Sequence, residues 1–502
     1  MLSDKNQKIW YVIVFSIAIA VGFWLYNPLP LYFLNDDLIH IPLSRQGVLF
    51  QRNSLRPLGD LSLYMDYLLW QKNASGYHIT NLLLHVINTV LVFFLSNQLL
   101  NKYKGSKNHL QSAATAVLFF IYAFHSEGVF WIIGRSASLG AMFCIPAIIL
   151  YLKRDENFIY FILSLLFFSA GLFAYESIWI FPLIASCISI IDIRKFKRTP
   201  QNEIAFISII SISFVVHLIF KRQFLGHFAR EYEADAFMSF NAIRLAGNMF
   251  KLGIRCFVPP VENQIYFLIL GALLFTAGVL IYFRIRRRIN SFPVTYLAFI
   301  FLLISFLPYL SLGINTHTVE GERYEYLPSV FASLLLVQVI FVIISNKIHQ
   351  LILLSILFTY HIIGLKISGH YYSTASSISK KTFAQINQLN GKKRLFIDSL
   401  PIEFNGALIF RSGFDEGVEW LKEPGSVDSI FIHTIKRNNS DWKHNLKIEK
   451  HALMDGPKID SILIKDDNNA VSYTQKQFKQ VNFNRQTDAW FIYRNDTLLI
   501  IK

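Results

Sequence analysis

Two adjacent carboxylates, Asp36 and Asp37, follow the first long apolar segment of the sequence. Each loses hydration close to lipid, so a pair of them at a membrane surface is costly unless it serves a purpose. Neighbouring carboxyl groups also push their pKa values apart, which leaves one as a base and the other as its orienter or acid partner. The pattern therefore predicts chemistry in the first loop, residues 27–78, and leaves open which aspartate is the base.

Further residues that could bind a charged ligand lie in the polar stretches between apolar segments. Arg323 stands among aromatic residues, a setting that suits a phosphate because guanidinium is weakly hydrated and binds oxyanions in a fork. Glu127 and Arg135 lie eight residues apart, where they could flank a charged ligand or simply neutralise each other. Besides the two aspartates, the candidate binding residues are Arg56, His78, His125, Glu127, Arg135, Glu176, Arg323 and Tyr324.

The composition indicates a polytopic α-helical membrane protein. Of the 502 residues, 53% are hydrophobic and 16% charged, and the mean hydropathy is +0.39. The formal charge of +15 comes from Lys and Arg residues in short loops, which is the positive-inside pattern and argues against a nucleic-acid partner. Three cysteines are too few for a disulfide framework. The stretch after Lys8 is too long for a signal-peptide core, so we expect a retained first span.

Apolar runs of about 20 residues predict eleven membrane spans. Basic clusters fall in alternate loops and before the first span, which predicts a cytoplasmic N-terminus and places the Asp36/Asp37 loop on the outer face of the cytoplasmic (inner) membrane. The expected spans are 9–26, 79–100, 111–124, 136–152, 157–175, 177–192, 203–220, 264–283, 293–312, 327–345 and 350–367.

The character of the chain changes after about residue 370, where short β-rich runs alternate with polar turns. We therefore expect a membrane domain over residues 1–368 and a small extracytoplasmic α/β or β-rich domain over residues 369–502. The second domain carries no recognisable catalytic motif. Its side and position suggest the hypothesis that it selects an acceptor.

Several motifs, taken in order, resemble the GT-C superfamily of integral-membrane glycosyltransferases, nearest the protein O-mannosyltransferases and the tetratricopeptide-repeat-linked transmembrane O-mannosyltransferases. Each motif is weak alone, but the ordered set covers about the first 345 residues. The matching pieces are Asp36-Asp37, Arg56-Pro57-Leu58, Gly76-Tyr77-His78 with Asn81 and His85, His125-Ser126-Glu127, Trp131 to Arg135, Glu176, Glu322-Arg323-Tyr324 and Tyr326 to Ser329.

The resemblance implies a sugar donor carried on a polyprenyl or dolichyl phosphate and a first-loop Asp as general base for the acceptor hydroxyl. The leaving phosphate needs cations, which Arg323 with Arg135 or Arg56 could supply. These arginines favour a metal-independent mechanism without a cofactor, although a divalent metal is not excluded. The sequence departs from the pattern at Ala137 and Tyr175, where relatives commonly carry Asp and Lys, and these departures leave the sugar and the acceptor open.

We therefore expect a glycosyltransferase that moves a sugar from a polyprenyl-phosphate donor to a protein, lipid or glycan hydroxyl, in contact with membrane lipid. The alternative is a transporter or flippase of lipid-linked glycans, which would need no base. Such a protein would more often place ionisable residues near the middle of its spans. A third class, a non-catalytic scaffold that presents the C-terminal domain, fits poorly with acids and arginines converging from four loops.

Overall fold

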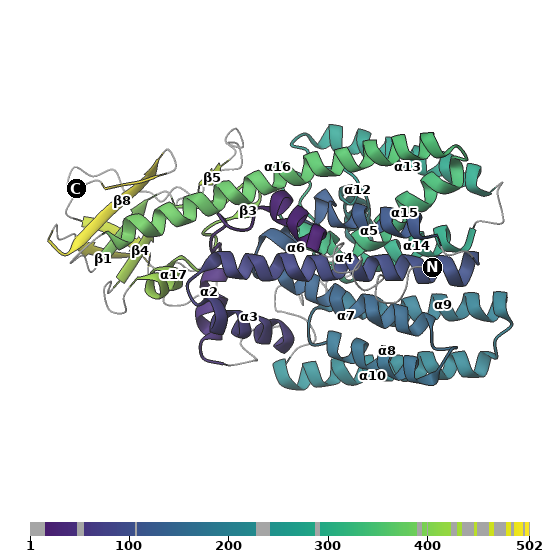
Figure 1. Ribbon diagram of the computed structural model, residues 1–502. Coiled ribbons are helices and arrows are strands. Elements are labelled where there is room, and N and C mark those ends of the chain that lie inside the picture. The colour runs from purple at the N-terminus through teal and green to yellow at the C-terminus, as the bar shows by residue number, and fades with distance from the viewer. Residues whose placement is uncertain are drawn as a thin grey trace.

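The computed structural model describes residues 16–47, 55–105, 108–226, 241–286, 292–388, 394–398, 400–422, 429–433, 446–448, 461–465, 478–482, 486–494 and 497–500. Within these ranges the chain forms a helical bundle, and the segment from Arg394 onward adds strands at one end (Figure 1).

Among the residues that the structure describes, seven helices are long and apolar enough to cross a membrane, as expected for a multi-pass membrane protein. Four shorter apolar helices occupy other predicted spans, Ser16–Tyr26, His109–Phe120, Phe158–Gly171 and Val294–Tyr309. A total of eleven spans stays a prediction. The bundle helices are α4 (Ala74–Lys104), α5 (His109–Phe120), α7 (Arg135–Leu152), α8 (Phe158–Gly171), α9 (Phe181–Phe196), α10 (Pro200–Leu225), α12 (Ala242–Arg255), α13 (Gln264–Arg286), α14 (Phe292–Ser305), α15 (Tyr326–Ile343) and α16 (Lys347–Asn387).

Short helices connect the long ones at the end of the bundle that adjoins the strands (Figure 1). In α3 the buried face carries Asp60 and Asp66, while Met65 and Leu69 are exposed. This inverted burial fits a helix that lies in the membrane interface with its apolar face toward lipid. The short helices are α2 (Asp37–Ser44), α3 (Pro57–Trp70), η1 (Ala123–His125), α6 (Glu127–Phe130), η2 (Glu176–Ile180), η4 (Leu307–Tyr309) and η5 (Glu322–Glu325).

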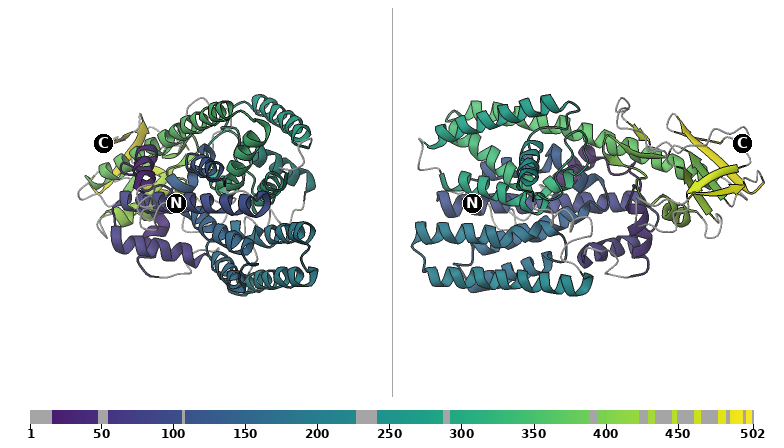
Figure 2. Two further views of the ribbon diagram at one scale, coloured as in Figure 1. Left: turned by 45° about the vertical axis from the view of Figure 1, so that its right-hand side comes forward. Right: turned by 180° about the vertical axis from the view of Figure 1, so that it is seen from behind.

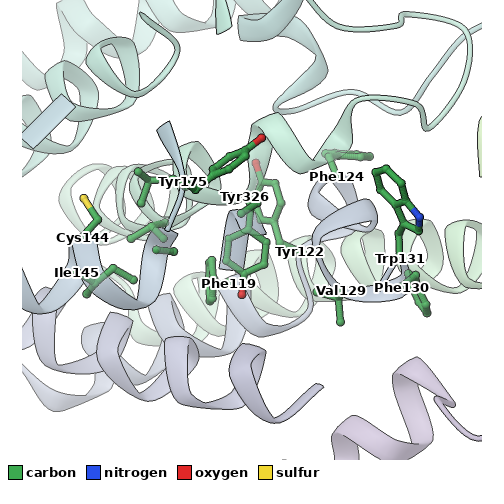
Figure 3. Close-up of a cluster of buried hydrophobic side chains, with 14 of the residues drawn as sticks. Phe119, Tyr122, Phe124, Val129, Phe130, Trp131, Cys144, Ile145, Tyr175 and Tyr326 are labelled. Atoms are coloured by element: carbon green, nitrogen blue, oxygen red, sulfur yellow. The ribbon is translucent and has the colours of Figure 1, made fainter. Parts of the chain in front are cut away.

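Helix α4 lies at the centre of the bundle, where it packs against α5 and α7. Aromatic side chains fill the core beneath the connecting loops: Phe119, Tyr122 and Tyr326 cluster there, with Trp131 at the edge (Figure 3). Since aromatic side chains bury large apolar areas, this cluster stabilises the conformation of the loops that pack on it.

Helix α16 extends past the bundle into the C-terminal region (Figure 1). It runs through residue 368, where the sequence predicts the domain boundary, and the division into two domains stays a prediction. In the described strands, β1 pairs in parallel with β4 and β8, and β9 joins β8 antiparallel; Figure 2 shows this sheet from behind. The elements are β1 (Arg394–Asp398), β2 (Pro401–Phe404), β3 (Ala407–Leu408), α17 (Phe414–Leu421), β4 (Ser429–His433), β5 (Leu446–Ile448), β6 (Ser461–Lys465), β7 (Phe478–Asn482), β8 (Asp488–Arg494) and β9 (Thr497–Ile500).

The C-terminal region contacts the first loop directly. Helix α17 packs on α2, and the ring of Trp420 lies 4.8 Å from that of Phe33, centroid to centroid. The loop that carries the adjacent aspartates is therefore held between the bundle and the C-terminal region.

Candidate active site

The two adjacent aspartates occupy different environments at the start of α2. Asp37 is fully buried, and its Oδ1 and Oδ2 accept backbone hydrogen bonds from Ile133 and Leu34, both at 3.0 Å. Burial raises the pKa of Asp37 well above its usual 3.8; the charge of Asp36 acts in the same direction, and the two hydrogen bonds oppose it. Asp37 therefore ties the first loop to the segment after α6.

Asp36 is only partly buried, so its carboxylate can meet a ligand. Its Oδ1 accepts hydrogen bonds from Asn35 Nδ2 at 3.1 Å and from Ser412 Oγ at 2.5 Å. Asn35 adopts a left-handed conformation with φ of 49°, which asparagine tolerates better than most residues. This turn starts α2 with the Asp36 side chain beside the C-terminal region.

Arg323 lies within electrostatic range of Asp36 and is fixed by three neighbours. It pairs with Glu127 at 2.6 Å, donates to the Tyr324 hydroxyl at 2.9 Å, and lies over the ring of Trp131 at 5.3 Å. The indole of Trp131 donates to the carbonyl of Leu34 at 3.3 Å, which joins this group to the aspartate loop. The Arg323 side chain keeps a quarter of its surface (25%) exposed, so it can bind an anion.

A second cation, Arg56, joins the same face through aromatic rings. Tyr324 stacks on Tyr309 at 4.8 Å, and Tyr309 lies 6.4 Å from Tyr175, whose ring carries the Arg56 guanidinium at 4.5 Å. Arg56 donates from Nε to Glu176 at 2.9 Å, and Glu176 also pairs with Lys221 at 3.2 Å. The two arginines thus stand at the ends of one polar and aromatic strip.

Three predicted binding residues are buried in the bundle. Arg135 is 1% exposed, pairs with Asp66 at 2.5 Å, and donates to the Tyr77 carbonyl at 3.0 Å. His78 and His125 are buried as well, and His125 shares a hydrogen bond of 3.0 Å with Ser329. Of the two arginines that the sequence offered as partners for Arg323, the geometry favours Arg56.

Sequence reasoning missed several partners of the predicted residues. Asp66, which pairs with Arg135, and Lys221, which pairs with Glu176, belong to no motif in the sequence. Glu322 was part of the resemblance, but its buried ion pair with Arg255, at 2.7 Å, connects residues far apart in the chain. Ser412 gave no local signal at all, because its role comes from the contact between the two regions.

No cluster of three or more His, Cys, Asp or Glu residues that could hold a metal ion occurs among the described residues. The residues present supply a partly exposed carboxylate and two paired arginines. Such a set can take a proton from a hydroxyl and stabilise a phosphate that leaves with negative charge.

No family model matches the chain. Curated proteins do: a protein O-mannosyl-transferase of Caenorhabditis elegans is 28% identical over 103 residues, 20% of this chain and 14% of that protein. Protein O-mannosyl-transferase Tmtc1 of Drosophila melanogaster is 33% identical over 111 residues, 22% of this chain and 12% of that protein. Protein O-mannosyl-transferase TMTC3 of Mus musculus is 29% identical over 173 residues, 30% of this chain and 18% of that protein.

These matches confirm the resemblance to the protein O-mannosyltransferases. The chain spans less than a fifth of the length of these relatives. Among solved structures, ArnT from Cupriavidus metallidurans in the apo state covers 86% of each chain with 11% identity and a TM-score of 0.35. The form of ArnT bound to undecaprenyl phosphate gives 10% identity and a TM-score of 0.32.

Proposed function

We propose that this protein is a glycosyltransferase that moves a sugar from a polyprenyl-phosphate donor to a hydroxyl group of a protein acceptor. The observation that carries the proposal is the pair of contrasting aspartates: Asp37 is buried and accepts two backbone hydrogen bonds, and Asp36 stays partly exposed within electrostatic range of Arg323. The curated relatives are named protein O-mannosyl-transferases, so mannose and a protein hydroxyl are the first donor sugar and acceptor to test.

In the proposed reaction Asp36 takes the proton of the acceptor hydroxyl while the acceptor oxygen attacks the anomeric carbon of the sugar. The bond between that carbon and the phosphate oxygen breaks, and the lipid phosphate leaves with the electron pair. Arg323 and Arg56 stabilise the growing charge because both are held in place before the reaction begins. The two arginines supply the positive charge that a divalent metal provides in other transferases, which favours a mechanism without a metal.

The site would lie on the outer face of the cytoplasmic membrane, where the loop charges place the first loop. Lipid-facing helices would keep the polyprenyl chain in the bilayer while its phosphate reaches the arginines. The exposed apolar face of α3, with Met65 and Leu69, is consistent with contact to membrane lipid.

The test uses the purified full chain in nanodiscs with a panel of radiolabelled polyprenyl-phosphate sugars and an acceptor peptide rich in Ser and Thr. Release of lipid phosphate and labelling of the peptide are followed together. General-base catalysis contributes about 10²- to 10⁴-fold, so we expect Asp36→Asn to lower turnover by that factor without loss of folding.

Equal turnover in wild type and Asp36→Asn would contradict the assignment of the base. Binding of a donor without turnover, together with passage of the donor across a vesicle membrane, would favour the transporter alternative instead. Transfer to a lipid or glycan, with the peptide unlabelled, would keep the reaction and change the acceptor.

A further inference from the structure

The C-terminal region reaches the aspartate loop through one short stretch, residues 405–413, which we call the docking segment. It is joined to the membrane domain by backbone hydrogen bonds at two places. The amide of Asn35 donates to the carbonyl of Ile409 at 2.7 Å, and the amide of Val319 donates to the carbonyl of Asn405 at 3.1 Å. The segment therefore bridges the two loops that carry Asp36 and Arg323.

Two glycines allow this close approach. Gly406 has φ of +90°, and a Cβ there would come within 2.6 Å of the backbone nitrogen of Glu320. Gly413 has φ of +78°, and a Cβ there would come within 2.7 Å of the carbonyl oxygen of Asn35. Both positions combine a backbone conformation that favours glycine with a contact that leaves no room for a side chain.

Ion pairs hold the middle of the docking segment. Arg411 pairs with Glu320 at 2.5 Å and with Glu403 at 2.9 Å. Glu320 precedes Arg323 by three residues, so the pair anchors the segment close to the cation of the site. The segment is thus fixed by backbone bonds at both loops and by charge between them.

Ser412 connects the docking segment to the side chains of Asn35 and Asp36. Its amide donates to Asn35 Oδ1 at 2.9 Å, and its hydroxyl lies 2.9 Å from the same oxygen and 2.5 Å from Asp36 Oδ1. A hydroxyl donates one hydrogen, and donation to a carboxylate is the shorter and stronger choice. Among the described residues, none donates a hydrogen bond to Asp36 Oδ2.

We propose that Ser412 is a positioning residue of the active site and that the C-terminal region completes that site. Ser412 and Asn35 hold Oδ1 of Asp36, which turns Oδ2 toward the acceptor hydroxyl. The inference rests on the proposed function, because it gives Asp36 the role of base. It also assigns the C-terminal region a part in the reaction itself, beyond the choice of acceptor.

The experiment compares Ser412→Ala, Ser412→Thr and wild type in the full chain, with the exposed Glu416→Gln in α17 as a matched control. A hydrogen bond to a charged group is worth enough to change a rate about 10- to 100-fold. We expect Ser412→Ala to lower kcat by that factor with the donor KM unchanged, because both arginines are untouched. Ser412→Thr keeps the hydroxyl and should restore most of kcat, and Glu416→Gln should match wild type.

Hydrogen exchange at the Asn35 amide gives a readout that needs no turnover. It should be faster in Ser412→Ala than in wild type and near the wild-type rate in Ser412→Thr. If Ser412→Ala matches wild type in kcat while Asp36→Asn is inactive, the positioning role is wrong and the proposed function stands. If no donor is turned over by wild type, the proposed function fails, and unchanged exchange in Ser412→Ala would then overturn the positioning role as well.

Discussion

Two polar regions lie at opposite ends of the bundle, and they differ in how far their charged side chains are buried. Away from the candidate active site, Lys102, Arg154, Asp192 and Glu203 form a network that joins α4, α9 and α10. Arg154 pairs with Asp192 at 2.8 Å and with Glu203 at 2.6 Å, and Lys102 pairs with Asp192 at 2.8 Å. The side chains of Arg154 and Asp192 have no exposed surface.

The candidate active site is open by contrast. Asp36 is partly exposed and Arg323 keeps a quarter of its surface (25%) accessible, whereas the Arg56 side chain is as buried as that of Lys102, each with 11% exposed. In a buried network the charges neutralise each other and stabilise the fold. In a partly exposed one, charged side chains are held in place where a substrate can reach them. The difference teaches that burial, more than residue type or pairing, separates the charges that hold the bundle together from those that we propose to meet a substrate.

The largest stability effect should come from the buried network. Arg154→Ala leaves the buried carboxylate of Glu203 without its arginine, and breaking a buried pair costs about 3–5 kcal/mol in the free energy of unfolding. Thermal unfolding in nanodiscs measures this loss, and turnover per folded molecule should stay near wild type. Arg194→Ala, an exposed change at the end of α9, is the matched control and should alter stability by less than about 0.5 kcal/mol. A loss of turnover without a loss of stability in Arg154→Ala would break the comparison.

Matched substitutions of one partly exposed and one buried arginine test the same comparison within the candidate active site. Arg323→Lys keeps the charge beside Glu127 but loses the planar fork, so we expect kcat/KM for the donor to fall about 10²-fold with little change in Tm. Arg135→Lys disturbs the buried contacts to Asp66 and Tyr77, so we expect a lower Tm with turnover per folded molecule retained. The opposite assignment of the two effects would show that Arg135 is the phosphate-binding cation.

The sequence predicted the helical bundle well, because long apolar runs leave a hydrophobic chain few alternatives in a bilayer. It also brought out Asp36, Asp37 and Arg323 from their types and loops. It could not separate the roles of the two aspartates, since these depend on backbone amides of Leu34 and Ile133 that reach only Asp37.

Arg154 lies in one of the short basic loops whose charges the sequence analysis used to predict the topology. Its burial depends on Asp192 and Glu203, which come from two other helices. Ser412 shows the same limit, because its partners lie more than 370 residues earlier in the chain. Contacts between distant segments create these roles, and no local pattern records them.

Asp37→Asn should cost about 1–3 kcal/mol in the free energy of unfolding. One oxygen of the carboxyl group, which accepts a backbone hydrogen bond, becomes an NH₂ group that faces the same amide, so a donor meets a donor. Burial raises the pKa of Asp37, which means that folding favours its neutral form. The stability it contributes is full below its usual value of 3.8 and is lost as the pH rises through the raised value.

Asparagine does not titrate, so the difference in Tm between wild type and Asp37→Asn should narrow as the pH rises. Unfolding scans of both proteins over a series of pH values measure this difference. A difference that widens with pH would mean that the ionised form of Asp37 is the one that folding favours. The loop would then be held by a charge, as in the buried network.

The smallest effect is expected at the ion pair that holds the docking segment. Burial alone would raise the pKa of Glu320, but the hydrogen bond and charge of Arg411, with Asn315, hold it below its usual 4.5. A lowered pKa contributes stability that is present above 4.5 and lost as the pH falls through the lowered value. Both side chains are partly exposed, at 28% for Glu320 and 39% for Arg411, so the contribution is at most about 1 kcal/mol.

Hydrogen exchange at the Val319 amide, which donates to Asn405, reports on the docking segment at each pH. After correction for the intrinsic exchange rate, wild type should lose protection as the pH falls below the usual pKa of 4.5. Glu320→Gln should show the same low protection at every pH, below that of wild type above 4.5 and equal to it once Glu320 is protonated. Protection that stays equal in the two proteins above that pH would show that the backbone bonds and glycine contacts hold the segment without the ion pair. The C-terminal region would then be held at the active site mainly by backbone hydrogen bonds and close packing at the glycines. The charged residues there would act in the reaction and not in docking.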